Sequence, residues 1–362
     1  MSITKDQVME QLKTVMIAKL GKNLVDLNMI KNVAVCDGLA RVTVELPAPA
    51  AAMKDQISFD VKKAVTLMQG MSVCEVEVTI QAQPSPQEQA QQSNPLPNIK
   101  HIIAVGAGKG GVGKSTVSVN LAVGLARAGA KVGLLDGDIY GPSLPTMLGL
   151  DDLETHTAGG NMIMPFDVHG IKSMTIGKLV EPDKPLIWRG PMAHGAFNQL
   201  VTQTQWGALD YLIIDMPPGT GDVPLTLAQL LPLTGAVVVC TPQKVAQDDA
   251  RRAIRMFEQL QIPLLGVVEN MSYFIGNDGV EYDIFGKGGA QAMAHQMDVP
   301  YLGGIPINMR LRANSDNGKP ISNFEDDAQL GLELEKVVNN LTQQVSVQVR
   351  QTELNTPTIS IS

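Results

Sequence analysis

Hydrophobic and polar positions along this chain predict two folded regions separated by a polar stretch. Between residues 99 and 340, short apolar runs alternate with segments of helical period, which is typical of parallel strands connected by helices. The expected strands are Ile102–Val105, Val132–Leu135, Tyr211–Ile214, Ala236–Cys240, Leu264–Val268 and Tyr301–Gly304. This pattern predicts an α/β fold whose mostly parallel sheet is covered by helices on both faces.

The N-terminal region shows a different order of elements. Its expected elements are a helix at Lys5–Leu20, strands at Ile30–Val35 and Leu39–Leu46 joined by the hairpin signal Asp37-Gly38, a helix at Met53–Leu67 and a strand at Ser72–Ile80. Residues 1–82 are therefore predicted to form a small α-β-β-α-β domain. A linker rich in Gln, Pro and Ser at 83–98 precedes the α/β domain at 99–340, and residues 341–362 are expected to be a poorly ordered tail.

Composition and charge exclude several classes of protein. The formal net charge of -8 argues against nonspecific nucleic-acid binding and against adsorption to anionic membranes. No apolar run has the length of a membrane span and the N-terminus lacks a signal-peptide pattern, so we expect a cytoplasmic protein. Cys36, Cys74 and Cys240 stand singly in apolar surroundings, which predicts core residues rather than disulfide or metal ligands.

A glycine-rich loop lies between the first strand of the α/β domain and a helix expected at Ser115–Ala128. It reads Gly-Lys-Gly-Gly-Val-Gly-Lys-Ser-Thr and fits the phosphate-binding loop pattern in its required strand–loop–helix context. Its backbone N–H groups would surround a phosphate chain, Lys114 would reach the β- and γ-phosphates, and Ser115 would bind Mg²⁺. The predicted nucleotide-binding residues are Gly108, Lys109, Gly110, Gly111, Val112, Gly113, Lys114, Ser115 and Thr116.

Polar residues follow three further strands, at the edge of the sheet where ligands bind in this fold class. Asp136 and Asp138 come after the second strand and would support Mg²⁺ or orient water, or else belong to a solvated turn. Asp215 ends the third strand in a Walker B pattern, and the Pro-Gly segment after it includes Gly219 and Gly221, whose N–H groups could contact the γ-phosphate. After the fifth strand, Asn270 suits either a purine edge or a turn.

Together these motifs resemble the Mrp/ApbC-type iron–sulfur cluster carriers. These are deviant-Walker P-loop ATPases related to MinD, ParA and the nitrogenase iron protein. The resemblance covers nearly the whole chain, with residues 1–82 similar to the small domain often fused to these carriers. The stretches that carry it are Gly108–Thr116, Ile214–Asp222, Glu269–Ser272 and Ile284–Gly289.

The resemblance implies ATP and Mg²⁺ as ligands and a homodimer as the working form. The implied catalytic residues are Lys109, Lys114 and Asp138. Lys109 would reach the partner's nucleotide, and Asp138 would orient the hydrolytic water. The implied Mg²⁺ residues are Ser115, Asp136 and Asp215, the adenine residue is Asn270, and the switch comprises Pro217, Pro218, Gly219, Thr220, Gly221 and Asp222. Implied partners are apo iron–sulfur proteins or cluster-assembly proteins, with neither membrane nor nucleic acid.

The cysteine positions depart from the family pattern. Typical carriers place Cys-x-x-Cys between the last two signatures, where this chain has Gly276 and Gly279. The small domain often has Cys-Pro where this chain has Ala51-Ala52. The resemblance implies a [4Fe–4S] cluster, but the usual thiolate ligands are absent, so no residue is assigned as an iron–sulfur ligand and ATP hydrolysis without a bridging cluster is predicted.

Two other functions fit the same scaffold. One is an ATP-dependent regulatory switch that acts on a protein partner without carrying a cluster. The other is a small-molecule kinase or synthetase, for which the region Met162–Gln199 offers Lys184, Trp188, Arg189 and His194. These residues are better interpreted as part of a dimer face or of contacts to the switch, since the scaffold alone does not fix the chemistry.

Overall fold

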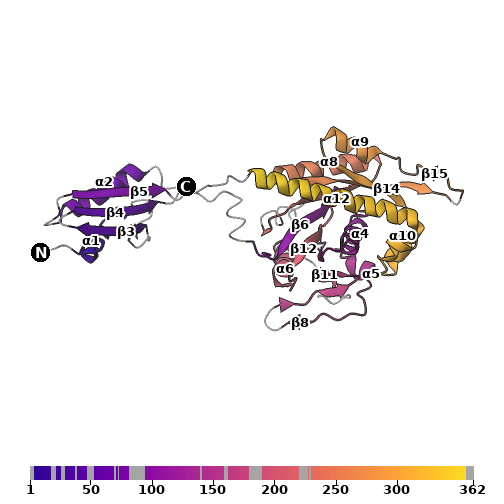
Figure 1. Cartoon of the computed structure of the whole chain (residues 1–362), viewed down its shortest axis with the longest axis horizontal. Coiled ribbons are helices and arrows are strands. Elements are labelled where there is room, and N and C mark those ends of the chain that lie inside the picture. The colour runs from indigo at the N-terminus through magenta and orange to yellow at the C-terminus, as the bar shows by residue number, and fades with distance from the viewer. Residues whose placement is uncertain are drawn as a thin grey trace. The chain divides into compact units, whose positions relative to one another are not determined.

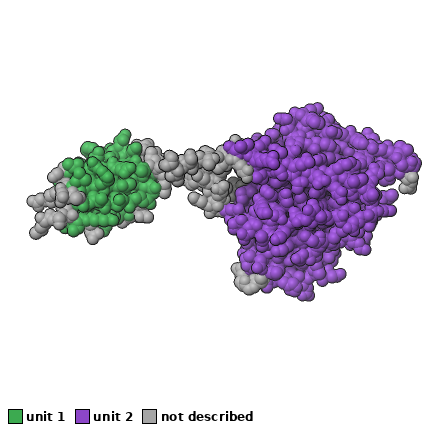
Figure 2. All heavy atoms as spheres, in the orientation of Figure 1, with its two compact units in different colours: residues 1–89 green, residues 90–362 purple. Residues whose placement is uncertain are grey.

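The structure is a computed structural model that describes residues 4–17, 22–25, 29–36, 39–46, 53–68, 71, 73–80, 94–138, 141–158, 162–178, 190–219, 227, 230–276 and 278–355. The chain divides into two compact units, Met1–Gln89 and Ala90–Ser362, which Figure 2 distinguishes by colour. Each unit has its own hydrophobic core, so each is described by itself.

The first unit packs two helices on a three-stranded sheet. Its main elements are α1 (Lys5–Leu12), β3 (Ile30–Cys36), β4 (Leu39–Leu46), α2 (Lys54–Thr66) and β5 (Val73–Ile80). Strands β3 and β4 are antiparallel, and β4 and β5 are parallel. Alternate residues of β4 are buried, which gives the sheet one covered face. The predicted α-β-β-α-β arrangement is confirmed, although Asp37-Gly38 and Ala51-Ala52 lie outside the described residues.

The first helix is shorter than predicted. It ends at Leu12 rather than Leu20, and a small antiparallel pair follows, β1 (Met16–Ile17) with β2 (Lys22–Asn23). Val15 is 6% exposed, and its carbonyl accepts a hydrogen bond from the Leu24 N–H. A continuing helix would remove that contact, so tertiary burial overrides the helical pattern here.

The second unit contains a nine-stranded sheet among the described residues. Its strands are β6 (Ile99–Gly106), β7 (Val132–Asp136), β10 (Phe166–Val168), β11 (Ile171–Thr175), β12 (Leu209–Asp215), β13 (Gly235–Cys240), β14 (Leu264–Ile275), β15 (Glu281–Tyr282) and β16 (Tyr301–Ile307). Their order is β10-β11-β7-β12-β6-β13-β14-β15, with β16 also on β14. Only β10/β11 and β14/β15 are antiparallel, so the predicted mostly parallel sheet is confirmed.

Helices cover both faces of this sheet (Figure 1). Ile102 and Ala104 of β6 belong to a core shared with α6 (Gly190–Gln203), α8 (Lys244–Gln259) and α9 (Gly289–Gln296). The alternating residues Ile103 and Val105 belong to a second core. The helices on that side are α4 (Lys114–Arg127), α5 (Leu144–Leu148), α10 (Met309–Asp316), α11 (Ser322–Glu325) and α12 (Ala328–Asn355). The shorter elements β8 (Thr157–Ala158), β9 (Met162–Ile163) and η2 (Ile176–Lys178) lie between β7 and α6 in the chain.

The expected disordered tail is wrong for residues 341–355. Helix α12 continues to Asn355, and its positions Leu334, Val337, Leu341 and Val345 are at most 2% exposed. These residues keep helical spacing and pack on the sheet, while Gln, Ser and Thr occupy the other faces of the helix. The polar composition therefore hid an amphipathic helix. Residues 356–362 lie outside the described part of the chain.

Candidate nucleotide site

The glycine loop lies at the carboxyl end of β6 and leads into α4, as its motif requires. At two positions, packing leaves no room for a side chain. A Cβ on Gly108 would lie 2.1 Å from the carbonyl oxygen of Asp249 on α8, and a Cβ on Gly113 would lie 2.1 Å from Nδ2 of Asn270. Gly113 also has φ of +80°, a conformation that favours glycine. These contacts fix the loop against its neighbours.

Asn270 supports the loop from β14. Its side chain is 4% exposed, and Nδ2 donates a hydrogen bond to the Val112 carbonyl at 2.8 Å. One of its donors is thus committed to the loop backbone. Its assignment to adenine recognition stays a prediction.

Lys114 and Asp215 form a buried ion pair at the mouth of the loop. Lys114 Nζ is 2.7 Å from Asp215 Oδ1, and the two side chains are 7% and 0% exposed. The Ser118 hydroxyl donates to the same Oδ1 at 2.7 Å, and Lys114 Nζ donates to Ser115 Oγ at 3.2 Å. Asp215 Oδ2 is buried and has no hydrogen-bond partner among the described residues. The second carboxylate oxygen is therefore available to a cation or its water shell.

Asp136 lies directly opposite Asp215 in the pairing of β7 with β12. Its carboxylate accepts hydrogen bonds from the Asp138 N–H at 3.1 Å, the Thr175 hydroxyl at 3.1 Å and the Leu144 N–H at 3.4 Å. Burial, together with the charge of Asp215, raises the pKa of Asp136 to about 7. Two adjacent buried carboxylates share one lysine, an arrangement that a further cation would stabilise.

The residues present fit Mg²⁺. This ion takes one or two carboxylates plus phosphate oxygens and keeps several waters, so it needs no cage of protein ligands. Ser115, Asp136 and Asp215 could provide such a partial shell, and the unpaired Asp215 Oδ2 supports this assignment. Over the described part of the chain, no group of three or more His, Cys, Asp or Glu side chains could hold a metal by itself.

The remaining catalytic and switch candidates lie around this centre. Asp138 is partly buried, and its Oδ1 accepts from the Gly141 N–H at 3.3 Å. Lys109 is partly exposed. The switch candidate Gly219 donates its N–H to the Ala107 carbonyl at 3.0 Å, so in this structure it contacts the loop backbone rather than the space for a phosphate. Pro217 and Pro218 precede it, while Thr220, Gly221 and Asp222 lie outside the described residues.

Gly276 and Gly279 belong to the turn between β14 and β15. The Gly276 N–H donates to the Val280 carbonyl and the Gly279 N–H to the Gly276 carbonyl, both at 2.9 Å. The Asp278 carboxylate accepts from the Val280 N–H at 3.0 Å and from the Tyr282 hydroxyl at 2.7 Å, which holds its pKa below the usual range. The described residues of this segment thus form a turn held by its own hydrogen bonds, and the two glycines offer no side-chain ligand.

The cysteines do not replace the missing pair. Cys240 is 1% exposed and its Sγ donates to the Thr241 carbonyl. Burial, with the nearby charge of Glu269, raises the pKa of Cys240 to about 12. Cys74 is also buried, and burial raises its pKa. Both are therefore protonated core residues near neutral pH, as predicted, while the side chain of Cys36 lies outside the described residues.

Glu269, the first residue of the signature Glu269–Ser272, has a structural role that the sequence did not predict. It is fully buried, and its carboxylate accepts hydrogen bonds from the Gly288 N–H at 2.9 Å, the Ala290 N–H at 2.7 Å and the Ser272 hydroxyl at 2.5 Å. It thus binds the N-terminus of α9, where a negative charge is favoured. The signatures Glu269–Ser272 and Ile284–Gly289 are held together by this carboxylate.

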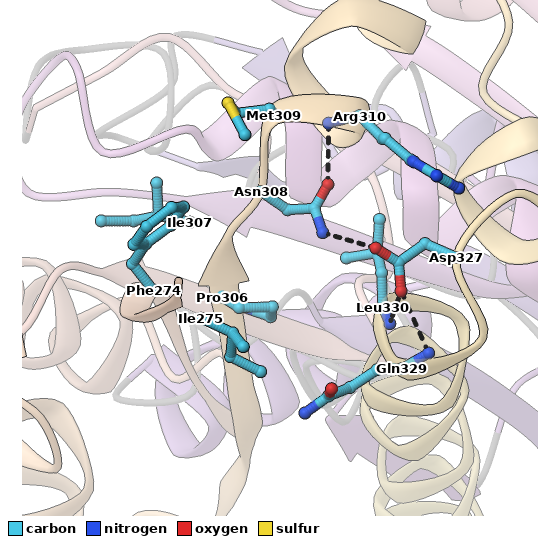
Figure 3. A pocket seen from close by; sticks show the side chains of 10 residues that line it. All are labelled: Phe274, Ile275, Pro306, Ile307, Asn308, Met309, Arg310, Asp327, Gln329 and Leu330. Atoms are coloured by element: carbon cyan, nitrogen blue, oxygen red, sulfur yellow. Dashed lines mark hydrogen bonds between the residues drawn. The ribbon is translucent and has the colours of Figure 1, made fainter. Parts of the chain in front are cut away.

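A cavity of about 210 Å³ opens at the same edge of the sheet, where β14 and β16 end (Figure 3). Its apolar lining includes Phe274, Pro306 and Ile307, and its polar rim includes Asn308 and Asp327. Asn308 Nδ2 donates to Asp327 Oδ2 at 2.9 Å, and Asn308 Oδ1 accepts from the Arg310 N–H at 2.8 Å. These two polar side chains bond to each other and to nearby backbone, and Arg310 and Gln329 add further polar groups to the lining. No motif in the sequence marks this cavity.

The structure does not test the residues considered for a kinase reaction. Lys184, Trp188 and Arg189 lie outside the described residues, as does the side chain of His194. No helix in the described portion is long and apolar enough to cross a membrane.

A phosphate-binding loop on a parallel sheet, with a buried lysine–aspartate pair beneath it, defines the class of P-loop NTPases. Residues 98–343 match the family described as "NUBPL iron-transfer P-loop NTPase", and residues 5–78 match "Iron-sulfur cluster assembly protein". The chain therefore belongs to the family of NUBPL-type iron-transfer P-loop NTPases.

Individual relatives agree with this assignment. The iron–sulfur cluster carrier protein of Synechocystis sp. is 45% identical over 350 residues, which is 95% of this chain and 99% of the relative. The nucleotide-binding protein of Archaeoglobus fulgidus, solved in complex with ADP, is 39% identical with a TM-score of 0.56, covering 64% of this chain and 91% of its own. The cell division ATPase MinD of Pyrococcus furiosus, 21% identical with a TM-score of 0.51, covers 67% of this chain and 98% of its own and shares the fold.

Proposed function

We propose that this chain is a homodimeric ATPase that serves iron–sulfur proteins or their assembly proteins without bridging a [4Fe–4S] cluster through a Cys-x-x-Cys pair. The observation that carries this proposal is the buried Lys114–Asp215 pair with one unpaired carboxylate oxygen, set beside Asp136 at the mouth of the loop. Family membership and the carrier relatives support the clients.

ATP hydrolysis by this site follows from placement and charge. Loop N–H groups and Lys114 would hold the phosphates, and Mg²⁺ held by Ser115, Asp136 and Asp215 would neutralise charge on the β- and γ-oxygens. Asp138 would orient the attacking water. The base would lie toward the cavity at Phe274 and Ile307, on the same edge of the sheet. The ADP complex of the Archaeoglobus fulgidus relative supports a nucleotide at this loop.

A second copy of the chain is proposed to face this edge, with Lys109 reaching the partner's nucleotide. Exposed apolar side chains gather on and beside the β14–β15 hairpin: Val280, Tyr282, Ile284 and Phe285 are 51%, 45%, 54% and 39% exposed. Isolated apolar residues on a surface are ordinary, but a contiguous group marks an interaction site. This hairpin supports the proposed dimer face.

This chain differs from the typical carriers in the residues that would hold the cargo, an iron–sulfur cluster. Cluster iron is ordinarily held by thiolates, and Gly276, Gly279 and the buried Cys240 offer none. The chain would then act on clients through its nucleotide cycle, or carry a cluster only with ligands from a partner. The second candidate function is a regulatory switch that carries no cluster. It is favoured by the same turn between β14 and β15, because Gly276 and Gly279 provide no thiolate there.

Three measurements test the proposal: ATP hydrolysis, sedimentation with ATP, and anaerobic reconstitution. Purified chain should hydrolyse ATP in a Mg²⁺-dependent manner and sediment as a dimer with ATP, and Lys109→Ala should abolish turnover. Anaerobic reconstitution should leave it without stoichiometric iron and sulfide. A monomer with unchanged turnover after Lys109→Ala would refute the dimeric mechanism, and a reconstituted cluster with a visible absorption band would refute the account of the cargo.

A further inference from the structure

A buried chain of side-chain amides connects the first turn of α4 to α11. Asn120 on α4 is 2% exposed and donates from Nδ2 to the Thr116 carbonyl at 2.8 Å. Its Oδ1 accepts a hydrogen bond at 3.0 Å from Nδ2 of Asn323, which is fully buried on α11. The nucleotide chemistry described above uses neither amide.

The chemistry of the amide group determines which atom donates and which accepts in these hydrogen bonds. Asn120 Nδ2 donates to the Thr116 carbonyl, and Asn120 Oδ1 is the atom that meets Asn323, so Asn323 must donate there. Asn323 supplies that donor, yet its own Oδ1 is buried without a partner among the described residues. A buried polar atom without a partner is unfavourable, so the donated hydrogen bond is the contribution that distinguishes Asn323 from an apolar residue.

Helix α11 packs against the C-terminal half of α4. Arg127, in the last turn of α4, forms an ion pair with Glu325 at 2.6 Å, and its guanidinium lies 5.2 Å from the Phe324 ring centroid. A Cβ on Gly124 would lie 3.1 Å from Phe324 Cζ, so the two helices approach closely. Contacts from the middle of α4, at Asn120, and from its C-terminal half, at Gly124 and Arg127, therefore set its position relative to α11.

We propose that Asn323 is a positioning residue for the phosphate loop: through Asn120 it holds the first turn of α4, where Lys114 and Ser115 lie. The inference rests on the proposed ATPase function. Mg²⁺ demands near-ideal octahedral geometry, so a small displacement of the Ser115 hydroxyl weakens metal binding more than it weakens the fold. Without the Asn323 donor, Asn120 Oδ1 loses its partner in the core, and the side-chain hydrogen bond from Asn120 to the Thr116 carbonyl is held less firmly.

The test measures the Mg²⁺ concentration that gives half-maximal ATP hydrolysis in the full chain. Asn323→Leu, which is close in volume and cannot donate, should raise that concentration roughly tenfold, the loss expected for one hydrogen bond. Asn323→Asp, which offers no donor when ionised, should do the same. A purely structural role would lower the unfolding midpoint and leave the Mg²⁺ requirement of the folded protein unchanged, and that result would overturn the proposal.

A double substitution tests whether the two amides act in series. Asn120→Leu should raise the Mg²⁺ requirement, and adding Asn323→Leu should raise it no further, because the second residue acts only through the first. Additive effects would contradict the proposal. Asn314→Leu is the matched control. Asn314 on α10, like Asn323, has one buried side-chain amide atom without a partner among the described residues, in its case Nδ2, and it takes no part in the hydrogen bonds between Asn323, Asn120 and Thr116. If the unchanged protein fails to hydrolyse ATP, the proposed function fails, and the Mg²⁺ dependence of ADP binding then tests Asn323 separately.

Discussion

At the scale of single residues, the buried Lys114–Asp215 pair has consequences for stability as well as for nucleotide binding. Removing one partner of a buried ion pair leaves an uncompensated charge in the core, which costs about 3–5 kcal/mol. Lys114→Ala should therefore lower the free energy of unfolding by about 3 kcal/mol or more, measured by urea denaturation without nucleotide. Lys109→Ala is the control, because this lysine is partly exposed, and it should cost less than about 1 kcal/mol. Equal losses would contradict the structural role.

The raised pKa of Asp136 predicts a pH dependence of stability. The folded protein holds a proton on Asp136 up to about pH 7, whereas the unfolded chain releases it near 3.8, so the folded state binds more protons in between. Stability from this group is complete below the unfolded pKa and is lost as pH rises toward about 7, by roughly 4 kcal/mol in all. Asp136→Asn should remove this decline. The test measures the free energy of unfolding of the unchanged protein and of Asp136→Asn between about pH 4 and 8, without Mg²⁺. If the two free energies change with pH in parallel, the prediction is contradicted.

At the scale of elements, Glu269 unites two sequence signatures by binding the N-terminus of α9. Hydrogen bonds to a charged acceptor contribute about 1.5–3 kcal/mol, and Glu269 accepts two from backbone N–H groups. Glu269→Ala should lower the free energy of unfolding by about 3 kcal/mol, because it also leaves those groups unpaired. Glu258→Ala, on the exposed side of α8, should change it by less than about 0.5 kcal/mol. Denaturant titration compares the two, and a negligible loss at Glu269 would show that α9 does not depend on it.

The conformation of the turn between β14 and β15 predicts that cysteines at positions 276 and 279 lower the thermal stability of the second unit. A Cβ on Gly276 would lie 2.5 Å from Asp278 Oδ1 and 2.7 Å from Tyr282 Cε2, and Gly279 has φ of +74°. The left-handed conformation alone costs about 1–2 kcal/mol for a residue other than glycine. Gly276→Cys with Gly279→Cys should lower the thermal midpoint of the second unit, measured with reductant present. Gly195→Ala, where a Cβ meets open space within a helix, should not lower it. A midpoint unchanged by the double substitution would show that the turn tolerates the cysteines.

At the scale of the whole molecule, the two units have separate cores and should unfold separately. Unit Met1–Gln89 buries its own cluster around Val42 and Val61, and the nucleotide site lies wholly within Ala90–Ser362. Calorimetry should resolve two transitions. A ligand that binds only the folded second unit stabilises it by about 2.7 kcal/mol at a concentration of 100 times its Kd. Mg-ADP should therefore raise only one transition, and a single transition that shifts as a whole would contradict the independence of the units.

The sequence by itself determined the features whose causes are local. The strand runs, the Gly108–Thr116 loop and the glycines at positions 276 and 279 depend on periodicity and residue type over a few positions, so the fold class and the family were predictable. The sequence misled where a polar composition hid the helical periodicity of α12, and where contacts between distant residues overrode a helical pattern after Leu12.

Only the tertiary structure decided which residues meet across long separations. The order of strands in the sheet places Asp136 beside Asp215, and the packing of helices places Glu269 under α9 and Asn323 against Asn120. The cavity at Phe274 likewise needs both β14 and β16. The energies of these buried polar contacts depend on partners and on desolvation, and no local pattern in the chain records either one.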